Sequence, residues 1–195
     1  STSAEDYATV KYSSDGNQLW VARYNGPGNS SDYARALAID NSGNVFVTGY
    51  SAGSGTYQDY ATIKYDPNGN QVWAARYNGP GNFADEAAAL VVDNSGNVYV
   101  TGKSSQIGAN LDYATIKYNS DGNELWVARY NGPGNGNDAA IDLALDTWGN
   151  IYVTGYSTGS GTNYDYATIK YSPDGNQLWV ARYDRPVNKT DTACG

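Results

Sequence analysis

The sequence predicts an all-β chain built from a repeated unit of four short antiparallel strands. The tetrapeptide DYAT begins at Asp6, Asp59, Asp112 and Asp165, so the pattern recurs every 53 residues without a change of register. Within one unit, apolar and polar residues alternate with a period of two, which is typical of strands and not of helices. Internal repeats of this length indicate structural units that stack and bury one another's faces.

The unit at residues 86–130 illustrates the expected elements. Its four predicted strands are EAAALVVD (86–93), NVYVTG (97–102), DYATIKY (112–118) and ELWVARY (124–130). NSG (94–96) and NSDGN (119–123) contain glycine, which favours the backbone conformation of hairpin turns. The longer connections at 103–111 and 131–138 leave room for a crossing between layers or blades. The first strand is nearly apolar, so we expect it to be the most buried, with the third and fourth strands nearer solvent.

Four-stranded units whose innermost strand is the most apolar predict the blades of a β-propeller. The chain is expected to be a single repeat domain, residues 1–195, with about three and a half blades. Its parts are a half blade at 6–24, full blades at 35–77, 88–130 and 141–183, and a tail at 184–195. Closed propellers have roughly four to eight blades, so the half blade leaves an unpaired strand edge that recruits another chain. The alternatives are a dimeric ring, an open filament or tube, and a segment of a longer propeller.

One recurring stretch also resembles a known family. DNSGNVYVTG (93–102), followed by DYATIKY (112–118) and a tryptophan-bearing strand, is similar to the bacterial SBBP β-propeller repeat. The similarity extends over almost all of residues 6 to 183 and depends on the recurrence of the pattern. It implies a propeller in an exported or surface protein without an assigned catalytic activity, and it brings no set of functional residues. Phe46, Ile151 and TWG (147–149) depart from the pattern and leave its core intact.

Composition narrows the classes of function. With 12 Lys and Arg against 20 Asp and Glu, the formal net charge is -8, which disfavours nucleic acids and anionic lipid surfaces as partners. No apolar run approaches the roughly 20 residues of a membrane-spanning helix, so we expect no membrane insertion. The chain has no histidine and no methionine but 19 tyrosines and 23 glycines, a composition typical of exported proteins. We therefore expect an extracellular or cell-surface location.

The sequence predicts no catalytic site, no metal site and no cofactor. Without histidine there is no His-based triad or histidine metal site, and the single cysteine, Cys194, has no partner for an internal disulfide. The aspartates that begin each DYAT, and Asp40, Asp93 and Asp146, recur in every full unit, so we expect them to shape turns. The DNSGN loops could also offer oxygen ligands to calcium, but they lack the carboxylate-rich spacing of an EF-hand loop.

The aromatic residues support two interpretations. Trp20, Trp73, Trp126 and Trp179 either stack on sugar rings in equivalent sites between blades or pack between blades, and alternation within a strand favours packing. Trp148 replaces the serine of an NSG turn, so we expect it to be exposed, either as a contact for a subunit or ligand or as a tolerated substitution.

The expected function is that of a noncatalytic, extracellular structural protein that assembles with copies of itself. The alternative is a lectin-like module with glycans as partners, for which the four repeated tryptophans are the candidate ligand-binding residues. The candidate residues for self-association are Asp6, Tyr7, Trp20, Trp148 and Cys194.

Overall fold

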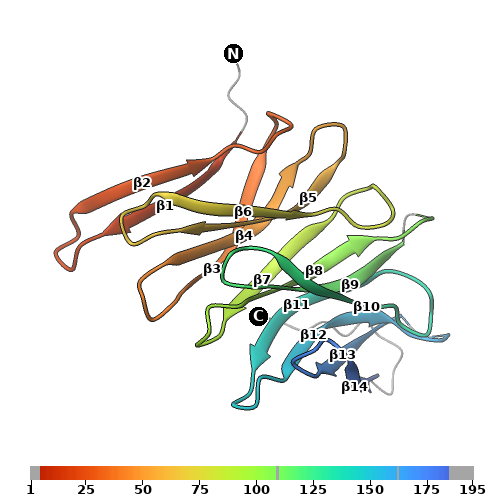
Figure 1. Ribbon diagram of the computed structural model, residues 1–195. Coiled ribbons are helices and arrows are strands. Elements are labelled where there is room, and N and C mark those ends of the chain that lie inside the picture. Colours follow the sequence, from red (N-terminus) through yellow and green to blue (C-terminus); the bar gives the residue numbers. More distant parts are fainter. Residues whose placement is uncertain (1–4, 109, 162, 185–195) are drawn as a thin grey trace.

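The computed structural model describes residues 5–108, 110–161 and 163–184, which contain 14 strands and no helix. The strands form one two-stranded and three four-stranded antiparallel sheets, which follow one another like the blades of an opened fan (Figure 1). The predicted all-β fold of four-stranded blades is confirmed. The half sheet consists of β1 (Tyr7–Tyr12) and β2 (Gln18–Tyr24). The first full sheet consists of β3 (Asp32–Ile39), β4 (Val45–Ala52), β5 (Gln58–Tyr65) and β6 (Gln71–Tyr77).

The other two full sheets repeat this arrangement. The second consists of β7 (Glu86–Val92), β8 (Val98–Ser105), β9 (Leu111–Tyr118) and β10 (Glu124–Tyr130). The third consists of β11 (Asp138–Leu145), β12 (Ile151–Thr158), β13 (Tyr164–Tyr171) and β14 (Gln177–Tyr183). Each full sheet begins slightly before the boundary expected from the sequence.

Every full sheet is a meander in which neighbouring strands are consecutive in the chain. The connection after β8, expected to leave room for a crossing, does not lead to another sheet, because β8 continues to Ser105, which pairs with Leu111 of β9 in the same sheet. Only the NGPGN connections, such as 131–135, lead to the next sheet.

Burial follows a different order from the one expected. The second and third strands are the most buried: Val98 and Val100 of β8 and Ile116 of β9 have no exposed surface. In contrast, Leu37 and Ile39 of β3 are 62% and 63% exposed. The prediction that the first strand is the most buried, and the third nearer solvent, is wrong. The first strands β3, β7 and β11 lie beside one another along the inner edge. The middle strands β4, β5, β8 and β9 are covered on both faces by adjacent sheets, whereas β12 and β13 are buried on one face only.

The apolar core lies between sheets. Three clusters of buried side chains occur in the described residues, one at each contact between consecutive sheets. A single sheet therefore has no core of its own, and its stability comes from its neighbours. No helix of the described part of the chain is long and apolar enough to cross a membrane.

Candidate functional site

The contact between consecutive sheets has a specific polar part, which we call the joint. At the first joint, the Trp20 Nε1 donates a hydrogen bond to the Pro67 carbonyl at 3.1 Å, and the Lys11 Nζ donates to the same oxygen at 3.0 Å. The indole lies against Gly69, where a Cβ atom would be 2.7 Å from Trp20 Cδ2. Gly69 also has φ of +87°, so both its conformation and the close approach of the indole require glycine.

The same joint occurs twice more along the chain. Trp73 and Lys64 donate to the Ser120 carbonyl at 3.0 and 3.1 Å, with the indole against Gly122. Trp126 and Lys117 donate to the Pro173 carbonyl, both at 3.1 Å, with the indole against Gly175. These three tryptophans thus pack between blades, each with its indole against a glycine turn.

A buried tyrosine adds a second bond to each joint. Tyr7 Oη donates to the Ala61 carbonyl of the next sheet at 3.2 Å, and Tyr60 and Tyr113 make the equivalent bonds. Burial is the main cause that raises the pKa of Tyr7 far above its usual value. Tyr7 and Trp20, both expected to contact another copy, instead join the half blade to the first full blade of the same chain.

An arginine completes the contact. Arg129 donates to Tyr77 Oη of the preceding sheet at 3.0 Å and, in its own sheet, to Ser104 Oγ at 2.6 Å and Asp112 Oδ2 at 3.2 Å. Asp112 is 2% exposed. Its burial raises the pKa of its carboxyl, although the hydrogen bond from Gln106 and the charge of Arg129 act in the opposite direction. Arg76 and Arg182 form the same network in the other two full sheets.

At β13 and β14 the donating half of the joint faces solvent. Trp179 is 41% exposed, and Tyr183 is 59% exposed although Tyr24, the matching residue of β2, is 9% exposed. Lys170 lies over the ring of Tyr152, with its Nζ 4.8 Å from the ring centroid, much as Lys117 lies over Tyr99 at a formed joint. We call Tyr166, Lys170, Trp179 and Tyr183 the donor end.

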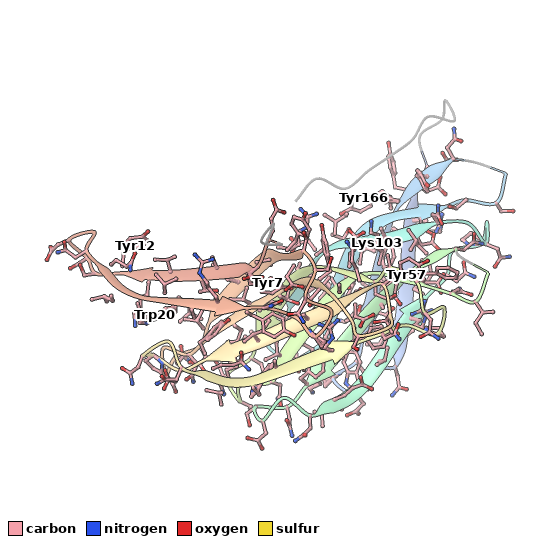
Figure 2. The ribbon with its side chains drawn as sticks, turned by 90° about the horizontal axis from the view of Figure 1, so that it is seen from above. Tyr7, Tyr12, Trp20, Tyr57, Lys103 and Tyr166 are labelled. Carbon is pink, nitrogen blue, oxygen red and sulfur yellow. The ribbon has the colours of Figure 1, made fainter. Side chains whose placement is uncertain are left out.

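At β1 and β2 the accepting half faces solvent. Tyr12 is 58% exposed, whereas Tyr65 at the matching position of the next sheet is 1% exposed. Gly16 has φ of +79°, like the glycines of the formed joints, but no described atom lies within 4 Å of the Cβ position. Figure 2 shows this hairpin, with Tyr12 near its tip, projecting from the rest of the molecule. We call Ala8, Tyr12, Ser14, Gly16 and Arg23 the acceptor end.

The remaining candidate residues lie apart from the joints. Trp148, in the turn between β11 and β12, is 80% exposed as expected. Asp6 precedes β1 and is half-buried. Cys194 lies outside the described residues.

Asp40, Asp93 and Asp146 close turns as expected. The expectation that the DYAT aspartates also shape turns is wrong for the full sheets, because Asp59, Asp112 and Asp165 lie within strands and pair with arginines. The Asp93 carboxylate accepts hydrogen bonds from the amides of Ser95 and Asn97 at 2.8 and 2.9 Å, and from Asn97 Nδ2 at 2.8 Å. Partial burial opposes ionisation of Asp93, but these hydrogen bonds outweigh it and hold the pKa below the usual value. Within the described residues, no group of three or more Cys, Asp or Glu side chains has the arrangement of a metal site.

Replacement of Asp93 by asparagine is expected to reduce the free energy of unfolding at pH 7 by about 1 to 2 kcal/mol, because charged hydrogen bonds are lost. The folded-state pKa is lowered, so this stabilisation is present above the unfolded-state pKa of about 3.9 and is lost as the pH falls through the folded value. Urea titrations at pH 7 and below pH 3 measure the difference. An equal difference at both pH values would contradict the role of the ionised carboxylate.

The structure also gathers a polar cluster that the sequence analysis did not identify. Arg35, Glu86 and Lys103 line one cavity of about 320 Å³ at the inner strands, and Lys103 Nζ lies 3.1 Å from Glu86 Oε2. The matching positions of the other full units carry other residue types: Ala88 and Ile141, Tyr33 and Ala139, and Tyr50 and Tyr156. A comparison of charge at each position of the repeat would have found all three, whereas a search for motifs does not.

The comparison with protein families agrees with this architecture. Residues 19–55, which include β3 and β4, match the family model SBBP, described as a beta-propeller repeat. No curated protein matches the chain. Among solved structures, a eukaryotic initiation factor is 10% identical with a TM-score of 0.49, over 92% of this chain and 43% of its own. A protein of unknown function from Bacteroides caccae is 10% identical with a TM-score of 0.37, over 90% of this chain and 75% of its own.

The chain thus spans less than half the length of the initiation factor. The resemblance to the SBBP repeat is confirmed over residues 19–55, and the same strand pattern recurs every 53 residues in the sheets that follow. Residues 19–55 of this chain therefore match an SBBP beta-propeller repeat, and the sheets that follow have the same strand pattern.

Proposed function

We propose that this protein is a noncatalytic repeat scaffold that associates head to tail with copies of itself. The observation that supports this proposal is that both halves of the joint, which are buried together inside the chain, are exposed at opposite ends of the row of sheets. The occupant proposed for each exposed half is the complementary end of a second copy. The composition, with no histidine and many tyrosines and glycines, supports an extracellular setting.

The hydrogen-bond donors of one end match the acceptors of the other. By analogy with the internal joints, Trp179 Nε1 and Lys170 Nζ of one copy would donate to the Ser14 carbonyl of the next, with the indole against Gly16. Tyr166 Oη would donate to the Ala8 carbonyl in the same copy. These pairs repeat contacts that the chain already forms between its own sheets, so a new copy continues an established interface.

The remaining contact of the joint would run in the opposite direction. Arg23 would donate to Tyr183 Oη, as Arg182 does to Tyr130 Oη at 2.8 Å inside the chain. Since Tyr12, Trp179 and Tyr183 are each at least two-fifths exposed, their burial would stabilise the contact by about 1.5 to 3 kcal/mol for each fully buried aromatic side chain. The two surfaces differ, so the contact is heterologous and gives a ring if its rotation closes and a filament if it does not.

Two variants test this assembly. Trp179→Ala removes the donating indole, and Gly16→Asn places a side chain where the indole would lie. Asparagine tolerates positive φ, which Asn29, Asn82 and Asn135 adopt in this protein, so the hairpin should remain folded. We expect the mass from light scattering to exceed that of one chain for the wild type and to equal one chain for each variant.

The mixture of the two variants gives the sharpest result. Each variant retains one intact end, so an equimolar mixture should form dimers that grow no further, with one intact joint each. Trp148→Ala, which removes an exposed tryptophan away from the joints, is the matched control and should assemble as the wild type does. A monomeric wild type at about 0.1 mM, or a mixture that stays monomeric, would overturn the proposal.

A further inference from the structure

We propose that the cavity lined by Arg35, Glu86 and Lys103 binds a small ligand that carries a single carboxylate, of the size and chemistry of a sugar acid. The site lies on the inner strands, and this inference is independent of self-association. Figure 2 shows Lys103 far from Tyr12 and Trp20 of the projecting hairpin.

The first support comes from the repeat itself. The charges of the joints recur unchanged in every unit, because each blade must fit the next. Arg35, Glu86 and Lys103 break the repeat, come from strands β3, β7 and β8, and yet line the same cavity. Neither the joints nor the turns use them. Charged side chains that depart from a repeat and converge in space are candidates for a function of their own.

The second support is the way in which the backbone forms the site. The first strand of each full sheet has a register shift at Ala34/Ala36, Ala87/Ala89 and Ala140/Asp142. Such bulges redirect side chains and are common next to binding sites. Alanines from β7 and β11 form much of the lining and leave space that larger side chains would fill. The alanines are Ala87, Ala88, Ala139 and Ala140.

The charges of the three side chains suit a ligand with one negative charge. Arg35 is held from one side, since its Nη2 donates to Tyr50 Oη at 3.1 Å and its guanidinium lies 5.2 Å from the centroid of that ring. It has no carboxylate partner among the described residues, which leaves donors for the two oxygens of a ligand carboxylate. With Lys103 positive and Glu86 negative, the three side chains sum to one positive charge in a chain of net charge -8.

A sugar-sized body fits the rest of the cavity. Tyr156 also lines the cavity and offers both an apolar ring and a hydroxyl group. Pockets that bind small ligands combine such apolar surfaces with a few polar groups that fix the orientation. This site differs from the lectin-like site expected from the sequence, because it uses none of the four repeated tryptophans.

Substitution of Glu86 should change the affinity for the ligand in the opposite direction from substitution of Arg35 or Lys103. Its carboxylate pairs with Lys103 and repels an incoming carboxylate, so Glu86→Gln should strengthen binding of a monoanion by about fivefold. Arg35→Gln and Lys103→Gln should each weaken it by about tenfold or more, as expected for the loss of a charged hydrogen bond. A cluster that serves only stability would not give opposite effects on binding.

The test is calorimetric titration of the full chain with sodium D-glucuronate, with D-glucose as the neutral comparison. Trp148→Ala is the control, because it changes an exposed side chain beyond the end of β11 that lies away from the cavity residues Ala139 and Ala140, and it should leave binding unchanged. We expect saturable binding of glucuronate, at least tenfold weaker binding of glucose, and the opposite effects of Glu86→Gln and Lys103→Gln. Binding should also persist in Trp179→Ala, so failure of self-association leaves it unaffected. The absence of saturable glucuronate binding, or weaker binding by Glu86→Gln, would overturn the inference.

Discussion

Arg129→Gln is expected to lower the free energy of unfolding by about 3 kcal/mol at pH 7, because it leaves the Asp112 carboxylate buried without its cationic partner. The substitution also removes the hydrogen bonds to Ser104 and to Tyr77 of the preceding sheet. Chemical denaturation monitored by tryptophan fluorescence measures the loss. The matched variant is Arg23→Gln, at the same position of the half blade, where the described residues provide no ion pair. In the Trp179→Ala background, which is expected to be monomeric, it should cost less than about 0.5 kcal/mol.

The loss should also depend on pH. Burial raises the pKa of Asp112 in the folded state, so stability linked to this group is fully present below its unfolded pKa of about 3.9 and falls as the pH rises through the folded value. Arg129 limits this effect, since its charge lowers the pKa. The difference between the wild type and Arg129→Gln should therefore be larger at pH 7 than at pH 4. A constant difference would indicate that the arginine acts through packing alone.

Gly122→Ala should have the second large effect, a loss of about 2 to 5 kcal/mol in the free energy of unfolding. Gly122 has φ of +84°, where a side chain costs about 1 to 2 kcal/mol. The added Cβ would also lie 2.7 Å from Trp73 Cδ2, and overpacking of this kind costs about 1 to 3 kcal/mol.

A second glycine separates these two causes. Gly43 has φ of +80°, but its nearest neighbour is Pro67 Cγ at 3.6 Å, an ordinary contact. Gly43→Ala should therefore lose only the conformational part, about 1 to 2 kcal/mol. Thermal unfolding of both variants gives the comparison, and equal losses would show that the indole yields to the added methyl group without cost.

The strands were predictable because their causes are local. Alternation in DYATIKY and the glycine turns on either side place β9 within one residue of its observed start. Burial was less predictable, because it depends on what covers a strand. The apolar run 86–93 was expected to be the most buried, but β7 lies at the inner edge, and the full cover falls on β8 and β9.

The positions of the candidate site residues were likewise predictable only in part. Alternation favoured packing of the repeated tryptophans between blades, and Trp20, Trp73 and Trp126 pack so. The acceptor for Trp20 is a backbone carbonyl 47 residues away, and no side-chain motif marks such a group. Tyr7 was expected at an exposed surface, but the fold uses it inside the chain.

The sequence by itself determined the repeat, its spacing, the strands and their turns, because hydrophobic period and glycine conformation act over a few residues. Only the tertiary structure decided which residues are used within the chain and which remain exposed. Each joint combines groups from two consecutive units, so identical residues are buried at Tyr65 and exposed at Tyr12, according to whether a neighbouring sheet covers them. The same dependence on neighbours brings Arg35, Glu86 and Lys103 into one cavity, although 68 residues separate the first from the last in the chain.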